Sequence, residues 1–178
     1  MQNKYALFVP HETSYMESAV YSHQTVGILI DGNNIDMGIN GAYGSAATLD
    51  YLKFVPKLLN TRKLIFLHYF REGSTISDKF REFLKVNFYG VAKPCGKSAD
   101  VALAIQAVSL ASEVNTIVIF SGDVDFCPLV EYLRSVGKRV EIVYVAGTES
   151  KVLLEKADNA IGIQRIDTRF NKVSPISL

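Results

Sequence analysis

Short apolar runs rich in β-branched residues alternate along this chain with longer segments whose apolar residues recur at helical spacing. This alternation restricts the fold more than any other feature, because parallel strands have to be joined by crossover segments that are usually helices. The predicted strands are a run that starts at residue 25, "KLIFLHYF" at 63–70, "TIVIF" at 116–120, "KRVEIVYVA" at 138–146 and "IGIQRIDT" at 161–168. The predicted helices lie within 48–60, 75–88, 100–110, 126–136 and 149–160. We therefore expect a three-layer α/β/α domain with a mostly parallel central sheet.

Two segments carry more specific expectations. The residues after the first strand are rich in Gly, Ala and Ser and predict a loop, to which Asp36 is assigned. In the helix that starts at Asp100, Val101, Ile105 and Val108 recur at helical spacing among further apolar residues. This pattern predicts a helix that is buried on most sides.

Length and composition limit the class of protein. With 178 residues, of which 48% are hydrophobic, the chain can form the core of a single domain. We divide it into an N-terminal extension at 1–24, a domain at 25–170 and a C-terminal tail at 171–178. The formal net charge of +1 gives no global electrostatic reason to expect a nucleic-acid partner.

Cysteine usage and hydropathy both indicate the cytoplasm. Cys95 and Cys127 occur without a CxxC motif or a Cys/His cluster, which favours a reducing compartment and argues against a zinc site. No apolar run approaches the roughly 18 residues of a membrane span, and the N-terminus lacks the pattern of a signal peptide. The chain is therefore predicted to be cytoplasmic, with no membrane partner. Its oligomeric state stays open between a monomer and a homo-oligomer.

Four aspartates are expected at one edge of the predicted sheet. Asp31 follows the first strand, Asp123 and Asp125 follow the strand at 116–120, and Asp100 opens a helix. In an open parallel sheet, the carboxyl ends of the strands and the starts of the crossover helices meet at the same edge. Ligands bind in the crevice at that edge, so these carboxylates are candidates for a functional site.

Carboxylates that converge without a histidine or cysteine repel one another unless a cation neutralises them. Oxygen ligands of this kind suit Mg²⁺ or Mn²⁺, and one or two such ions can activate water for phosphodiester hydrolysis. Each aspartate also has an ordinary structural explanation, because Asp is common in turns and at the starts of helices. Their coincidence at one edge favours the metal site.

Four motifs, taken in order, are similar to those of a known family. They are "ILIDGNNI" at 28–35, "KSADVALAIQAVSLA" at 97–111, "IVIFSGDVDFCPLVEYLRSVGKRVEIV" at 117–143 and "LLEKADNAI" at 153–161. Together they resemble the NYN domain in its bacterial LabA-like branch, from about residue 25 to 167. The resemblance implies a PIN-like fold and a metal-dependent ribonuclease, a hydrolase that acts on single-stranded or structured RNA.

The resemblance also implies roles for individual residues. Asp31 and Asp123 would be direct metal ligands, and Asp100 and Asp125 would complete the site through the metal or through water. Further residues that the resemblance places near the substrate or behind the ligands are Asn33, Ser121, Lys97 and Gln106. Of these, Lys97 would meet the RNA backbone as a point charge.

One residue departs from the family pattern. Relatives commonly read "KGVDVALAVD" where this chain has "KSADVALAIQ", so that Gln106 stands where an Asp often occurs. A neutral amide at this position would weaken cation binding. The departure supports a second hypothesis, in which the chain is a catalytically weak NYN-like module that binds RNA or a protein and regulates without cleaving. Metal binding discriminates between the two hypotheses.

Other phosphate-handling folds fit less well. A haloacid-dehalogenase-like phosphatase has Asp-x-Asp after its first strand, where this chain has Asp31, Gly32 and Asn33. A Rossmann or P-loop nucleotide-binding domain requires a glycine-rich phosphate loop, and neither GxGxxG nor GxxxxGK[ST] occurs in the sequence. The sequence therefore favours the acidic site over a nucleotide loop.

Overall fold

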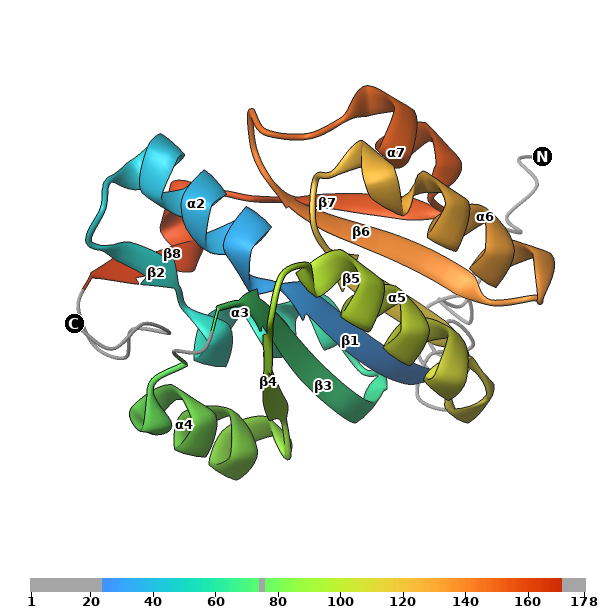
Figure 1. Cartoon of the computed structure of the whole chain (residues 1–178), viewed down its shortest axis with the longest axis horizontal. Helices are drawn as coiled ribbons and strands as arrows, with labels where there is room; N and C mark the ends of the chain where they lie inside the picture. Colours follow the sequence, from blue (N-terminus) through green and yellow to red (C-terminus); the bar gives the residue numbers. More distant parts are fainter. Residues whose placement is uncertain (1–23, 74–75, 171–178) are drawn as a thin grey trace, which may run out of the picture.

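The computed structural model describes residues 24–73 and 76–170, and a parallel sheet of six strands forms its centre (Figure 1). In sequence order these strands are β1 (Thr25–Asp31), β3 (Lys63–Glu72), β4 (Val91–Cys95), β5 (Thr116–Phe120), β6 (Arg139–Val145) and β7 (Asn159–Ile163). Their spatial order is β4-β3-β1-β5-β6-β7, and every neighbouring pair is parallel. Apart from Gln24, the predicted extension at 1–24 and the predicted tail at 171–178 lie outside the described residues.

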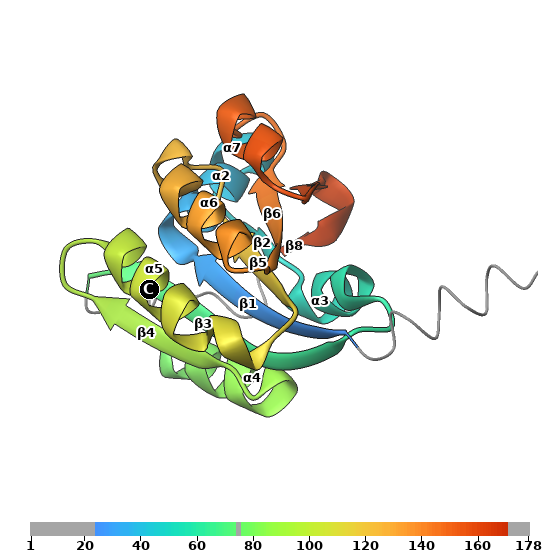
Figure 2. The same ribbon diagram turned by 90° about the vertical axis from the view of Figure 1, so that its right-hand side faces the viewer.

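Helices cover both faces of this sheet (Figure 2). They are α2 (Gly32–Tyr43), α3 (Tyr51–Leu59), α4 (Asp78–Phe88), α5 (Ala99–Leu110), α6 (Cys127–Ser135) and α7 (Lys151–Lys156). Helices α2, α3 and α4 share one apolar core with strand residues such as Ile28, and α5, α6 and α7 share a second core with residues such as Ile119. The predicted three-layer α/β/α fold with a parallel central sheet is thus confirmed. Within the described ranges, no helix is both long and apolar enough to cross a membrane.

The order of the strands reverses beside β1. From β1 the chain moves outward to β3 and β4, and it then returns to the other side of β1 to form β5, β6 and β7. Open α/β sheets bind ligands at such reversals, outside the carboxyl ends of the strands. Asp31 ends β1, and Ser121 directly follows the neighbouring strand β5. The reversal therefore lies where the sequence predicted the acidic site.

Residues 32–43 form helix α2, so the loop predicted after the first strand is wrong. The helix begins because the Asp31 carboxylate accepts a hydrogen bond from the Asn34 amide, which caps the first turn. Ile35 and Ile39 are fully buried, and their packing outweighs the low helix propensity of the glycines in this segment. Gly32 is required by packing, since a Cβ at this position would overlap the ring of Tyr69.

A small antiparallel sheet shortens the next predicted helix. Residues Ala47–Leu49 (β2) pair with Thr168–Phe170 (β8), so helix α3 begins only after its N-cap residue Asp50. The sequence instead predicted a helix over the whole of 48–60. The antiparallel partner lies more than a hundred residues away along the chain, and local helical spacing carries no information about it.

The edges of the central sheet also differ from the prediction. Strand β4 was not predicted, because Pro94 weakens its local strand signal; an edge strand tolerates proline, and β4 is at the edge. Strand β7 starts at Asn159, before the predicted 161–168. The Asp158 carboxylate accepts a hydrogen bond from the Val140 amide (2.8 Å), which joins this segment to β6 and ends the helical region.

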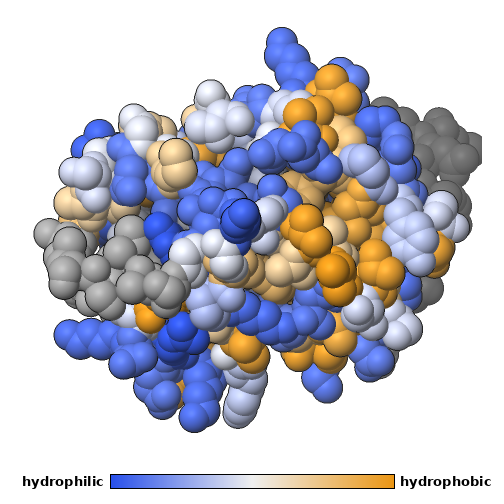
Figure 3. Space-filling view, in the orientation of Figure 1, coloured by the Kyte–Doolittle hydropathy of each residue, from blue (hydrophilic) through white to orange (hydrophobic). Residues whose placement is uncertain are grey.

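Helix α5 is less buried than its sequence predicted. Leu103 and Ala107 pack on the sheet, but Val101 and Ile105 are 61% and 63% exposed, and Val108 is also exposed. Apolar side chains are visible on this face of the molecule, where α5 and α6 form the outer layer (Figure 3). The expectation of a helix buried on most sides is therefore wrong. The helix is apolar on all sides, but only one side meets the sheet.

Candidate acidic site at the carboxyl edge of the sheet

The four predicted aspartates lie at the same edge of the sheet. Asp31 ends β1, Asp123 and Asp125 follow β5, and Asp100 is in the first turn of α5. Burial raises the pKa of Asp100, and the negative charges of Asp123, Glu72 and Asp125 add to this rise. The structure thus brings the acids close enough to repel one another, at the shared edge that the sequence predicted.

Asp31 is the buried member of this group, with 4% of its surface exposed. Its Oδ1 accepts a hydrogen bond from the Asn34 amide (3.1 Å), and its Oδ2 accepts one from the Ser121 hydroxyl (3.4 Å). Burial raises the pKa of Asp31 to about 6, the Asn34 amide opposes this rise, and repulsion from Asp100 and Asp123 adds to it. A negative charge on Asp31 is therefore costly in this protein without a cation.

A network of hydrogen bonds fixes the loop that carries Asp123 and Asp125. The Ser121 hydroxyl accepts from the Asp123 amide (3.2 Å), and Asp123 Oδ1 accepts from the Asp125 amide (3.0 Å). Ser121 is fully buried and contacts both Asp31 and Asp123, so it holds the two acids relative to each other. Gly122 packs against the backbone of Thr148, and an added Cβ would lie 3.0 Å from its carbonyl oxygen.

The two asparagines after Asp31 connect β1 to both neighbouring strands. Asn33 Oδ1 accepts a hydrogen bond from the Glu72 amide at the end of β3 (2.8 Å). Asn34 Oδ1 accepts one from the Gly122 amide after β5 (3.0 Å). Asn33 was predicted to orient ligands or bind phosphate, and in the structure its carbonyl oxygen holds the backbone of β3. The matching role of Asn34 was missed, although both residues stand in the same DGNN motif.

Glu72 is an acid of this edge that the sequence analysis missed. It is the last residue of β3, the neighbour of β1, and its charge contributes to the raised pKa of Asp100. The predicted strand stopped at residue 70, two residues before the observed end. A strand extended to the acidic residue before Gly73 would have included Glu72 among the acids of this edge.

Lys97 and Gln106 lie near this edge but in different surroundings. Lys97 is exposed in the short connection between β4 and α5. Gln106 accepts a hydrogen bond from the ammonium group of Lys93, which also lies over the ring of Phe70 at 5.6 Å from its centroid. Within the described residues, the contact that orients Gln106 is therefore with a lysine of the edge strand.

The other buried acids of the described structure each have a cationic partner. Asp36, which the sequence assigned to a loop, lies inside α2 and pairs with Arg71 and the hydroxyl of Tyr69. The remaining pairs of a buried acid with its cations are Glu141 with Arg62 and Arg139, and Asp167 with Lys57. Among the described residues, Asp31 is the buried acid that no lysine, arginine or histidine neutralises.

The donor atoms at this edge are of the kind that a hard cation prefers. Asp31, Asp100, Asp123 and Asp125 offer carboxylate oxygens, and within residues 24–73 and 76–170 no imidazole or thiol is close enough to complete a set of three ligands with them. Over the described ranges, however, no three acidic, histidine or cysteine side chains converge closely enough to enclose a metal ion. The acids are close enough for their charges to repel one another, but their carboxylate groups do not converge on a single position. Their chemistry fits a divalent cation, and binding one would require these side chains to draw together.

Comparison with known proteins agrees with this arrangement. The model of the NYN domain family matches residues 25–164, which include all four aspartates. The chain belongs to the NYN domain family. NYN domains have the PIN-like nuclease fold, and nucleases of this fold are generally dependent on divalent metal ions. A search of the curated proteins gives no match.

A solved structure supports the fold of this NYN domain. The chain is similar to a protein of unknown function from Vibrio parahaemolyticus, known from its crystal structure, with a TM-score of 0.71 and 24% sequence identity. The match covers 82% of this chain and 96% of the other. At this level of identity the likeness concerns the arrangement of helices and strands.

Proposed function

We propose that this NYN domain is a divalent-metal-dependent ribonuclease of the LabA-like branch. The observation that carries the proposal is the state of Asp31, a buried carboxylate at the strand-order reversal that has acids and, among the residues the structure describes, no cation beside it. Three other buried acids in the described structure have cationic partners, so the isolation of Asp31 is not a general property of this fold. A bound cation would remove the repulsion and allow Asp31 to ionise fully.

Asp31 and Asp123 are the residues that would hold Mg²⁺ or Mn²⁺, with Asp100 and Asp125 completing the set directly or through water. Such an ion supplies Lewis-acid activation of water and of a phosphoryl oxygen, which is the chemistry of phosphodiester hydrolysis. Ser121 keeps Asp31 and Asp123 in a fixed relation, because its hydroxyl bonds to the side chain of one and the amide of the other. Lys97, exposed at the same edge, would contact the phosphates of single-stranded or structured RNA.

A second function is favoured by two observations. The described acids do not enclose a metal ion, and Gln106 contributes no charge to the site and binds Lys93. Both are expected of a regulatory NYN-like module that binds RNA or a protein without cleaving it. Such a module would not need to bind a divalent cation, whereas the ribonuclease would.

Cleavage of a mixed panel of labelled RNAs and single-stranded DNAs tests the proposal. The purified protein is incubated with Mg²⁺ or Mn²⁺, and EDTA, Asp31→Asn and Asp123→Asn serve as controls. Asp78→Asn is the matched variant, because it makes the same chemical change at an exposed position in α4. We expect RNA cleavage by the wild type and by Asp78→Asn, and a loss of at least a hundredfold in the other three arms.

The same samples separate the two functions. Mg²⁺ and Mn²⁺ binding by calorimetry, with the fold checked by circular dichroism, shows whether the acids bind a cation. A folded protein that binds neither metal and cleaves no RNA would contradict the ribonuclease proposal. RNA binding by that protein in EDTA, measured by filter retention, would then support the regulatory module.

A further inference from the structure

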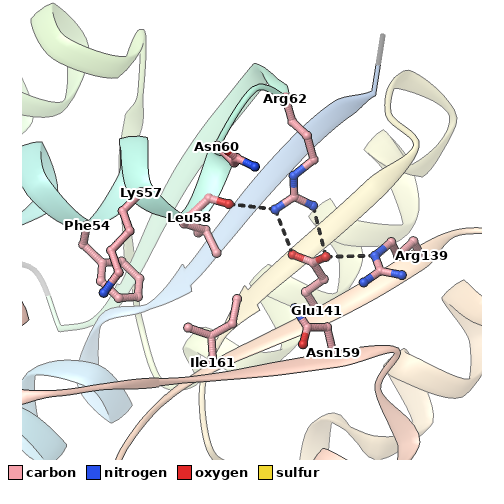
Figure 4. A pocket seen from close by; sticks show the side chains of 9 residues that line it. All are labelled: Phe54, Lys57, Leu58, Asn60, Arg62, Arg139, Glu141, Asn159 and Ile161. Atoms are coloured by element: carbon pink, nitrogen blue, oxygen red, sulfur yellow. Dashed lines mark hydrogen bonds and ion pairs between the residues drawn. The ribbon is translucent and has the colours of Figure 1, made fainter. Parts of the chain in front are cut away.

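A cavity of about 290 Å³ lies at the amino ends of β6 and β7 (Figure 4). The aspartates lie at the opposite edge of the sheet, after the carboxyl ends of the strands. Its walls come from the end of α3 and from the first residues of the two strands. Phe54, Leu58 and Ile161 give it an apolar surface, and charged and amide side chains form the rest. Nothing in the proposed cleavage of RNA uses this cavity.

A saturated ion-pair network forms one side of the cavity. Glu141 accepts two hydrogen bonds from Arg62, each 3.0 Å long, and one from Arg139 Nε (2.8 Å). Figure 4 shows the two arginines approaching the carboxylate from different sides. Arg62 also donates to the carbonyl oxygen of Leu58 (2.8 Å). The acceptor capacity of Glu141 is therefore largely used by the protein itself.

The groups that stay available to a ligand are donors or amides. Arg139 uses only its Nε within the described residues, so its two terminal nitrogens are free to donate at the half-exposed rim. Lys57 donates to Asp167 at 3.3 Å, its one hydrogen-bond partner in the described part of the chain, and its ammonium group keeps further donor capacity. The side chains of Asn60 and Asn159 make no hydrogen bond with another described residue, and each offers a donor and an acceptor.

Charge and shape together define what the cavity can accept. Its lining contains three cations, Lys57, Arg62 and Arg139, and one carboxylate, which is already saturated. An excess of donors and positive charge selects an anion, and the planar end of an arginine matches a phosphate group in a bidentate manner. The volume is near the lower limit of small-molecule sites, about 300 Å³, which suits one compact ligand with an apolar body.

We propose that this cavity is a binding site for a nucleoside 5′-monophosphate. The phosphate contacts the terminal nitrogens of Arg139, the base lies against Leu58 and Ile161, and an asparagine amide forms hydrogen bonds with the edge of the base. Lys57 lies across the cavity from Arg139 (Figure 4) and adds positive charge without contacting the same phosphate. Two sources supply this group: a free mononucleotide and the 5′-phosphorylated end of an RNA. The site is separate from the acidic edge, so the proposal does not depend on cleavage activity.

Calorimetric titration of the full chain, in EDTA, tests the proposal. The probes are AMP, GMP, CMP and UMP, with adenosine and inorganic phosphate as partial ligands. A short RNA is used with a 5′-phosphate or a 5′-hydroxyl, which distinguishes the free nucleotide from the RNA end. We expect saturable binding of at least one mononucleotide, at least tenfold tighter than that of adenosine or inorganic phosphate.

Two variants locate the binding. Arg139→Gln removes the positive charge and the guanidinium donors and leaves Glu141 paired with Arg62, so the fold is retained and the affinity should fall at least tenfold. Arg134→Gln is the matched control: both arginine side chains are 47% exposed and pair with a carboxylate, but Arg134 lies outside the cavity. Amide chemical shifts of Asn60 and Asn159, followed by NMR, show independently of the variants whether the ligand enters the cavity.

The outcomes that overturn the proposal are distinct. They are no saturable binding by the folded wild type, equal affinity for inorganic phosphate, or equal losses in Arg139→Gln and Arg134→Gln. Shift changes confined to Asp31 and Asp123 would also overturn it, because they would assign the nucleotide to the acidic edge. None of these results bears on whether the acidic edge cleaves RNA in the presence of a metal.

Discussion

At the amino edge of the sheet Glu141 lies between two arginines, whereas at the carboxyl edge Asp31 lies among other acids. Both side chains are buried, and both sit on central strands of the same sheet. Glu141 accepts three charge-assisted hydrogen bonds. Asp31 accepts one from a backbone amide and one from a hydroxyl. The protein therefore neutralises the charge of Glu141, whereas among the described residues no cation neutralises that of Asp31.

The difference shows how to separate structural from functional acids in this fold. The charge of a paired buried carboxylate is already neutralised by the protein, and an added cation would have to displace an arginine. An unpaired carboxylate among others of its kind is stabilised by any cation that reaches it. Burial alone would have ranked Glu141 above Asp31, because it is 2% exposed against 4%. The neighbours decide the role of each acid.

The largest effect on the free energy of unfolding is expected from breaking the ion pair between Glu141 and Arg62. Glu141→Ala would leave Arg62, whose side chain is 9% exposed, without its carboxylate. Removing one partner of a buried ion pair typically costs about 3 to 5 kcal/mol, and we expect this loss in the free energy of unfolding measured with urea. Glu155→Ala, an exposed glutamate of α7, is the control. The double variant Glu141→Leu with Arg62→Met should recover most of the loss, since no buried charge is then left unpaired. A loss below about 1 kcal/mol in Glu141→Ala would mean that the pair is not a structural element.

The pairs at the amino edge also mark the limit of what the sequence could predict. Strand β5 was predicted with its observed bounds, Thr116–Phe120, because five consecutive buried residues leave a continuous apolar run. Its parallel direction followed from the crossover helices, whereas its neighbours β1 and β6 were not predicted. The Arg62–Glu141 pair joins residues 79 positions apart, and no local pattern contains that information.

The acidic edge was predictable for a different reason. The carboxyl ends of parallel strands lie at the same edge of the sheet whatever the loops do, so placing Asp31 and Asp123 at one edge required only the strand assignment. What the sequence could not give was the state of each acid. Asp36 is also an aspartate and follows Asp31 by only five residues. In the structure it lies in helix α2, which directs its carboxylate towards Arg71 and Tyr69. That helix itself was missed, because its stability comes from a cap and from buried isoleucines.

A smaller effect on the free energy of unfolding, of opposite sign, is expected from neutralising Asp31, the unpaired acid. The folded pKa of Asp31 is raised from 3.8 to about 6, so folding takes up a proton between these values and the wild type loses stability as the pH rises through them. Asp31→Asn removes this loss and keeps the helix cap, since Asn caps as well as Asp. In EDTA, urea unfolding should give equal stabilities near pH 4, and the variant should be more stable by about 2 to 3 kcal/mol near pH 8. Added Mn²⁺ should then narrow the gap by stabilising the wild type alone. A difference that does not change with pH would show that Asp31 carries no such penalty.

The smallest effect is expected at position 106, where a new carboxylate can be tested with and without a cationic partner. Gln106→Glu keeps the length of the side chain and places a carboxylate against the ammonium of Lys93, which now donates to the amide. The new acid would be paired as Glu141 is, but in a half-exposed position, where an ion pair contributes only about 0.2 to 1 kcal/mol to the free energy of unfolding. Because Lys93 neutralises it, this carboxylate should not tighten Mn²⁺ binding in calorimetry. Adding Lys93→Met to Gln106→Glu removes the partner and leaves another unpaired acid near the edge, and Mn²⁺ should then bind more tightly than to the wild type. Tighter binding with Gln106→Glu alone would instead show that the charge at this position reaches the metal whatever its neighbour.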